Sequence, residues 1–127
     1  MSTYALLLRL DGYDAIDWPS DPDERLPTLS RHLGGTPHLS AVDITPRLCI
    51  WSDGDRQHHG AAPRNGAAEL VSVLRAEPPL TACYGTAIVT GGADTQGRIE
   101  GLTPRQFVAL LRVIGVYIPE IPKQSTN

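Results

Sequence analysis

The fold prediction starts from Tyr4-Ala5-Leu6-Leu7-Leu8-Arg9-Leu10, a run that is closed by Asp11-Gly12. This nearly continuous apolar run is too short for a helix of ordinary length and ends in turn-forming residues, so it predicts a buried β-strand. The next segment, residues 13–18, does not alternate cleanly between apolar and polar side chains. It fits either a second short strand or a packed loop, and both interpretations stay open.

Three further strands are predicted beyond this opening run. Residues 39–44 alternate apolar and polar side chains, residues 48–51 do so less clearly, and Thr45-Pro46-Arg47 between them supplies a turn. The two segments therefore predict a β-hairpin. Residues 83–90 are rich in residues typical of strands and lead into a glycine-containing loop, so they predict the fourth main strand.

Three helices are predicted from capping residues and apolar spacing. A helix over residues 22–33 follows an Asp N-cap, has prolines in its first turns and stops at a Gly-Gly pair. A helix over residues 65–74 starts at Asn65, a good N-cap, and stops before two prolines. A helix over residues 103–114 has a capping-box pattern, proline at its first position and an apolar stripe.

The resulting order, β-α-β-β-α-β followed by α, predicts an α/β domain of the α+β type, built as a two-layer sandwich. This order matches the split βαβ arrangement of ferredoxin-like folds, and other two-layer sandwiches fit it as well. The chain has 127 residues, which is the usual size of one domain. We predict a single globular domain over residues 1–115 and a C-terminal tail over residues 116–127, which contains two prolines and a polar end.

Charge and cysteine content argue against several functional classes. The formal net charge is −3, and no clustered basic face is expected, which argues against generic binding to DNA or RNA. The start of the chain lacks an apolar core long enough for a signal peptide or a membrane span. Cys49 and Cys83 lie in apolar runs, as expected of reduced, buried thiols. These features predict a cytoplasmic protein without membrane contact.

Two segments are candidates for binding a ligand or partner. Arg64 directly precedes Asn65 at a predicted helix start, where free N–H groups also favour anions. The alternative is an N-cap Asn beside an incidental exposed Arg. The loop with Gly91, Gly92 and Asp94 is the second candidate, because glycine lets backbone N–H groups approach an anion. A loop that simply reverses the chain fits this segment as well.

No catalytic, metal or cofactor site is predicted. His58-His59 follow Asp53 and Asp55 closely, but adjacent histidines share neither a helix face nor a strand face, and no recognised ligand spacing is present. Asp53-Gly54-Asp55 lacks the later ligands of a calcium loop. Neither cysteine has an evident histidine partner, and the nucleophile motif G-x-S-x-G is absent from the sequence.

Residues 62–68 and 84–97 resemble a family of small uncharacterised bacterial and phage domains. They carry its P-x-N-x-x-A and G-x-A-[IV]-[IV]-x-G motifs, and Leu29–Gly35 echoes its L-x-x-x-x-G-G segment. The likeness covers roughly residues 4–112. It implies cargo of phages, plasmids and other mobile elements, in which small proteins often act by binding a host component, and it carries over no catalytic residues.

Two functions follow as expectations. The first is a noncatalytic protein-interaction or regulatory module with an unidentified protein partner, because the chain combines a compact fold and polar loops with no catalytic motif. The second is a binding protein for a small, nucleotide-like anion that uses Arg64, Asn65 and the backbone near Gly91 and Gly92. An enzyme ranks third.

Overall fold

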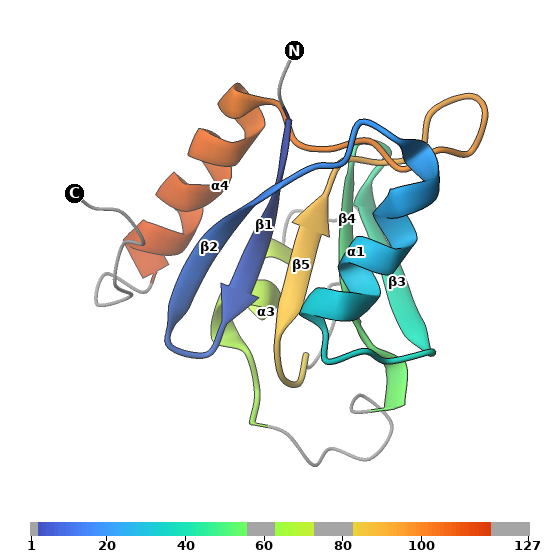
Figure 1. The fold of residues 1–127 in the computed structure, drawn as a ribbon. Coiled ribbons are helices and arrows are strands. Elements are labelled where there is room, and N and C mark those ends of the chain that lie inside the picture. The colour runs from blue at the N-terminus through green and yellow to red at the C-terminus, as the bar shows by residue number, and fades with distance from the viewer. Residues whose placement is uncertain (1–2, 56–62, 73–82, 118–127) are drawn as a thin grey trace.

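The computed structural model describes residues 3–55, 63–72 and 83–117. Within them, five strands form one sheet with the order β2-β1-β5-β4-β3, and all four neighbouring pairs are antiparallel (Figure 1). The strands are β1 (Tyr4–Arg9), β2 (Gly12–Asp17), β3 (Leu39–Thr45), β4 (Leu48–Asp53) and β5 (Ala87–Thr90). The central strand, β5, is buried along its whole length.

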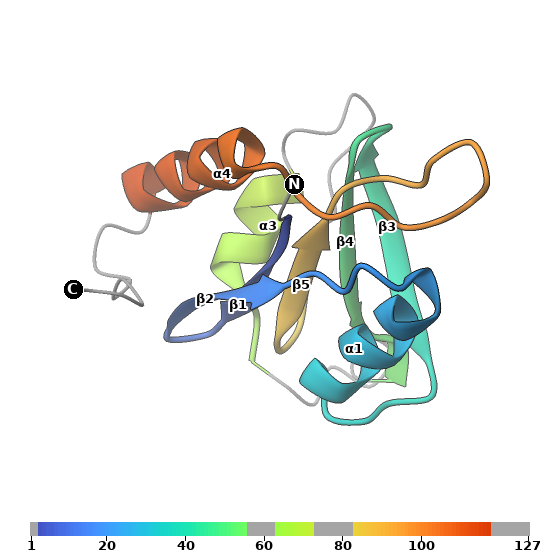
Figure 2. The same cartoon turned by 45° about the horizontal axis from the view of Figure 1, so that its top comes forward.

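Helices lie on both faces of this sheet (Figures 1 and 2). One face carries α1 (Arg25–His32), which follows the short 3-10 helix η1 (Pro22–Glu24). The other face carries α3 (Gly66–Ser72) and α4 (Pro104–Tyr117). The α1 helix stops where the sequence predicted, because Gly34 and Gly35 both adopt a positive φ, at 88° and 78°, that glycine tolerates best.

The continuous apolar run of β1 is explained by the helices on its two sides. Successive side chains of a strand point to opposite faces, so a strand that is covered on both faces needs apolar residues at every position. Two separate cores result. The core under α1 includes Ala5, Leu7, Ile16, Trp18, Leu29, Leu33 and Ile88. The core under α3 and α4 includes Leu6, Leu8, Ile50, Ala67, Val71, Val89, Leu110 and Ile114.

The segment that sequence analysis left open, residues 13–18, mostly forms the strand β2. It pairs with β1 along its whole length, from Arg9 opposite Gly12 to Tyr4 opposite Asp17. Its apolar pattern is blurred because it is an edge strand, in which Ile16 is buried but Ala15 is exposed.

The predicted α+β class is confirmed, and the structure adds detail to the predicted architecture. The structure is consistent with the predicted two-layer α+β fold, and its order contains one strand, β2, beyond the predicted order. The ferredoxin-like arrangement is not confirmed. The α4 helix continues to Tyr117, two residues into the predicted tail, and residues 118–127 lie outside the described part of the chain.

Candidate functional site

Asn65 lies at the start of α3 with its side chain only 1% exposed. Its amide nitrogen donates to the main-chain carbonyls of Leu8 and Gly85, each at 2.9 Å. Its amide oxygen accepts from the N–H of Ala68 at 3.1 Å, as an N-cap does. The side chain therefore joins the end of β1, the segment before β5 and the first turn of α3.

Arg64 faces an acid of the same chain. Its Nε lies 2.9 Å from Oε2 of Glu69, and its Nη2 lies 2.6 Å from Oε1. Oε2 also accepts from the N–H of Cys83 at 3.1 Å. The hydrogen bond from Arg64 lowers the pKa of Glu69, although burial opposes the shift. The predicted cationic fork is thus engaged by the helix that it precedes.

Gly91 and Gly92 are buried where the chain leaves β5. A Cβ atom on Gly92 would lie 2.0 Å from the carbonyl oxygen of Pro46, and one on Gly91 would lie 2.8 Å from that of Gly101. Both positions need glycine because another part of the backbone passes too close for a side chain.

Asp94 shapes the turn that follows these glycines. One of its carboxylate oxygens accepts from the N–H groups of Gln96 at 2.8 Å and Arg98 at 2.9 Å. The N–H of Asp94 donates in return to the carbonyl of Arg98 at 2.8 Å. The hydrogen bond from the Arg98 N–H is the main cause that lowers the pKa of Asp94. These contacts match the simple chain reversal that sequence analysis kept as an alternative.

The two predicted motifs do not meet. Asn65 contacts Gly85, which precedes β5, whereas Gly91 follows β5 at the opposite end of the strand (Figure 1). They therefore build no shared site among the described residues. Each of the five candidate residues also has a role in folding.

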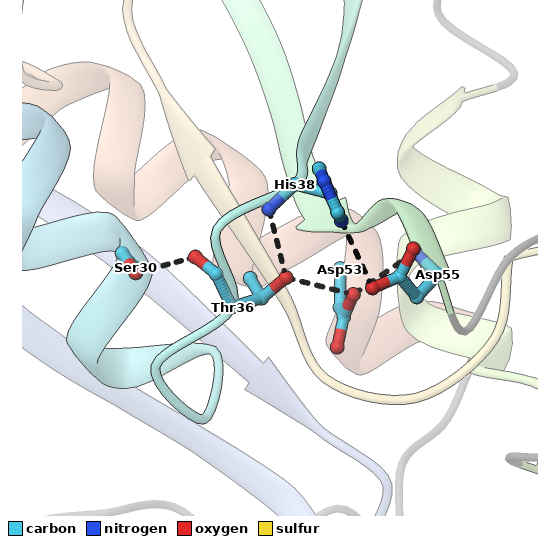
Figure 3. Close-up of polar contacts among 5 residues, drawn as sticks. All are labelled: Ser30, Thr36, His38, Asp53 and Asp55. Atoms are coloured by element: carbon cyan, nitrogen blue, oxygen red, sulfur yellow. Dashed lines mark hydrogen bonds and ion pairs between the residues drawn. The ribbon is translucent and has the colours of Figure 1, made fainter.

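A polar cluster that sequence analysis did not identify lies at one end of the sheet (Figure 3). The hydroxyl of Thr36 donates to Asp53 at 3.0 Å and accepts from the N–H of His38 at 3.0 Å. The hydroxyl of Ser30 donates to the carbonyl of Thr36 at 2.6 Å. Nδ1 of His38 lies 3.1 Å from Oδ2 of Asp55. The cluster ties the end of α1 and the following loop to the end of β4.

The register of the β3–β4 hairpin was the signal that could have revealed this cluster. Leu39 pairs with Asp53, and the N–H of Gly54 donates to the carbonyl of His38 at 2.7 Å. Residues just before the first strand of a hairpin and just after the second lie opposite each other. The pattern therefore places His38 beside Asp55.

The geometry of the cluster indicates a role in folding. The side chains of His38 and Asp55 are 68% and 57% exposed, so water screens their interaction. The two hydroxyls of the cluster already donate to acceptors within it. No group of three or more metal-ligating side chains occurs in the described residues, and His58-His59 lies outside them.

The two cysteines are buried and free, as predicted. Burial raises the pKa of Cys49 to about 12 and that of Cys83 to about 11. Both thiols therefore stay protonated at neutral pH, and a protonated thiol is a poor nucleophile.

Both edges of the sheet carry backbone groups that no described strand covers. Neither β2 nor β3, the two edge strands, pairs on its outer side with any strand in the described residues. Beside β2, on the face that carries α1, lies a groove of about 620 Å³. Leu7 and Ile16 line it together with Arg31 and His32 of α1.

None of the described helices is long and apolar enough to cross a membrane. Comparison of the chain with protein-family models, with curated proteins and with solved structures finds no match.

Proposed function

We propose that the protein is a noncatalytic interaction module that binds an extended segment of a partner protein by adding it as a strand to the outer edge of β2. Strand addition uses main-chain hydrogen bonds for affinity and nearby pockets for the alternating side chains of the bound segment. The single observation that carries the proposal is a regular edge strand, with no outer neighbour among the described residues, next to a groove.

The phase of the β1–β2 ladder identifies the backbone groups that a partner would contact. The N–H of Trp18 donates to the carbonyl of Thr3 at 3.1 Å, so this pair belongs to the hydrogen-bonded set. In an antiparallel pair, hydrogen-bonded and non-hydrogen-bonded positions alternate. Tyr13, Ala15 and Asp17 therefore direct their N–H and C=O groups away from β1, toward the open edge.

The opposite edge of the sheet is less suited to strand addition. The register of β3 shifts between Asp43 and Thr45, and such a bulge twists an edge strand and interrupts its pairing surface. In contrast, β2 keeps one register through all six of its residues. The two edges thus provide an internal comparison.

The groove beside β2 could hold side chains of the bound segment. Its floor includes Leu7 and Ile16, which suit an apolar side chain. Arg31 and His32 come from the last turn of α1, and Arg31 forms no ion pair with the described residues. Asp14 and Asp17 line the groove as well, so its charges are mixed, and a segment with an apolar residue beside polar ones would match this combination.

The alternative function, binding of a small anion at Arg64 and Asn65, has less support. Glu69 already accepts two hydrogen bonds from the Arg64 guanidinium. The buried amide of Asn65 is occupied by main-chain groups. A ligand at this position would have to displace contacts that hold β1 to α3.

The proposed setting follows the resemblance to bacterial and phage domains. It is the bacterial cytoplasm, where a module of mobile-element type would engage a host protein in a regulatory role. The resemblance supports this setting, and the open β2 edge supports the mode of binding.

The test uses two matched proline substitutions. Peptides that bind the wild type are selected from a displayed random library, and their affinities are measured by calorimetry. Ala15→Pro removes one outward N–H of β2 and places a ring where the partner strand would lie, so we expect binding to fall by more than about tenfold. Ala41→Pro makes the same change on the other edge strand, β3. Ala41 is also exposed, it lies opposite Trp51 of β4, and its N–H likewise points away from the neighbouring strand.

The proposal is supported if Ala15→Pro loses peptide binding while Ala41→Pro retains it, with both variants folded by circular dichroism. Equal affinity of the wild type and Ala15→Pro would show that the β2 edge is not the binding surface. Failure to select any peptide that binds the wild type would count against strand addition altogether.

A further inference from the structure

The outer edge of β2 is geometrically complementary to a second copy of itself. Its outward N–H and C=O groups belong to Tyr13, Ala15 and Asp17, which recur at every second residue. A second β2 strand that is related by a two-fold axis runs antiparallel and presents the same groups at the same spacing. Since β2 keeps one register through all six of its residues, no bulge interrupts this match.

The phase of the strand restricts the register of such a pair. Residues that exchange N–H and C=O groups across an antiparallel interface must both face outward from their own sheets. With the two-fold axis at Ala15, Ala15 lies opposite itself, and Tyr13 lies opposite Asp17 of the second copy. Every outward residue of β2 then has an outward residue opposite it, so the ladder extends along the whole strand.

The two neighbouring registers that keep this phase are less favourable. An axis at Asp14 would place two Asp14 side chains directly opposite each other, and like charges in that position destabilise a strand pair. An axis at Ile16 would place Tyr13 opposite Pro19, which has no N–H to donate. The axis at Ala15 avoids both problems, because it places Asp14 opposite Ile16.

The side chains of β2 also suit this register. Ala15, at the axis, is exposed and small, so it can lie opposite its own copy without a clash. The phenol of Tyr13 has a hydroxyl that can donate to the carboxylate of Asp17 in the second copy. This cross-strand pair would occur twice, once on each side of the axis.

The charges of the groove beside β2 are balanced, so they do not repel a second copy. Two arginines, Arg9 and Arg31, and two aspartates, Asp14 and Asp17, line it. Its remaining titratable group is His32, whose pKa is lowered by burial, so the imidazole is uncharged at neutral pH. Asp14, which pairs with Arg9 of its own chain, would approach the groove of the second copy, where Arg31 adds an opposite charge.

From this arrangement we propose that two copies of the chain pair through their β2 edges about a two-fold axis at Ala15, and that this self-pairing blocks the edge to other extended segments. The pairing stands on the geometry of β2 alone, whereas the blocking role rests on the proposed strand-addition function. An interface made mainly of one strand pair is small, and small interfaces are weak and transient. The edge would therefore become available when the protein is dilute.

Disulfide cross-linking of the full chain tests the pairing and its register. In Ala15→Cys the two Cα atoms at the axis would lie about 5.5 Å apart, which a disulfide can bridge. The variant is treated with oxidised glutathione, and the covalent dimer is measured on a non-reducing gel. The native cysteines, Cys49 and Cys83, are buried and should not react in the folded protein.

Two control variants carry an exposed cysteine at other edge positions. Asp17→Cys lies on the same strand, but at about 3.4 Å per residue its copy would be about 14 Å away, too far for a disulfide. Ala41→Cys lies on the other edge strand, β3, and is exposed as well. We expect Ala15→Cys to form the covalent dimer at least about tenfold faster than either control, because pairing raises the local thiol concentration.

The outcomes separate the pairing from the proposed function. Equal cross-linking of Ala15→Cys and the two controls, or a wild type that sediments as a monomer up to about 1 mM, would overturn the pairing but leave peptide binding untouched. For the blocking role, the cross-linked Ala15→Cys dimer should bind a selected peptide at least about tenfold more weakly than the same protein after reduction with dithiothreitol. Equal affinity before and after reduction would overturn the blocking role.

Discussion

Replacing Asn65 tests whether the most prominent sequence motif serves the fold. In Asn65→Ala, the carbonyls of Leu8 and Gly85 lose their donor, and the N–H of Ala68 loses its cap. A buried polar group without a partner costs about 1–3 kcal/mol, and a lost N-cap costs about 1 kcal/mol. The expected decrease in the free energy of unfolding is therefore about 3–7 kcal/mol, a large fraction of the stability of an ordinary domain.

Two further variants separate the contributions of the cap and the buried amide. Asn65→Ser keeps an acceptor for the N-cap, but its single hydroxyl cannot donate to both carbonyls. This variant should therefore recover only about 1 kcal/mol of the lost free energy of unfolding. Thr103→Ala removes an exposed cap of α4, where Thr103 and Gln106 exchange hydrogen bonds at 3.2 and 2.9 Å, and should cost about 1 kcal/mol.

The assay is urea denaturation of each variant, followed by circular dichroism at constant pH and salt. The dependence of unfolding free energy on urea should be the same for all variants, because none of them changes the surface that unfolding exposes. If Asn65→Ala and Thr103→Ala proved equally destabilised, the buried amide would contribute nothing beyond the cap, and the structural assignment of Asn65 would be refuted.

Three further predictions concern glycine positions, the buried cysteines and Glu69. Gly92→Ala should destabilise the protein strongly in urea denaturation, because its Cβ would lie 2.0 Å from a carbonyl oxygen, whereas Gly115→Ala, with nothing within 4 Å, should stabilise α4 by about 0.5–1 kcal/mol. The two buried cysteines, whose pKa values burial raises to about 12 and about 11, should react with a thiol reagent at pH 8 only after unfolding. Arg64 lowers the pKa of Glu69 in the folded state, so ionised Glu69 stabilises the fold fully above its ordinary pKa of 4.5. This stabilisation is lost as the pH falls from 4.5 through the lowered pKa of the folded state. Glu69→Gln should therefore make the unfolding free energy depend less on pH in this acid range.

Local signals in the sequence predicted the individual elements well. The helix over residues 103–114 was predicted from its capping box, and the structure confirms both hydrogen bonds of that box, between Thr103 and Gln106. The predicted strand over residues 83–90 is shorter, since β5 starts only at Ala87. The preceding residues instead form the bridge between Tyr84 and Arg64. Apolar composition alone does not distinguish a strand from the segment that leads into it.

Long-range contacts could not be predicted from local patterns. Sequence analysis identified Asn65 as an N-cap, but its two other hydrogen bonds go to Leu8, 57 residues away, and to Gly85. The order of strands in the sheet depends on such contacts as well. This explains why the second strand was left open between two interpretations and why the position of β5 between β1 and β4 was not foreseen.

In the candidate sites, the same residue types can indicate either a structural role or a binding role. Glycine, asparagine and aspartate are the residues that turns and caps require, so a motif rich in them stands out in a sequence whether or not it binds anything. In this chain Asn65, Gly92 and Asp94 all satisfy such demands. Groups that could bind a partner are those that the fold positions but leaves uncompensated. The outward backbone of Ala15 meets this criterion, although this residue forms no part of a recognisable motif.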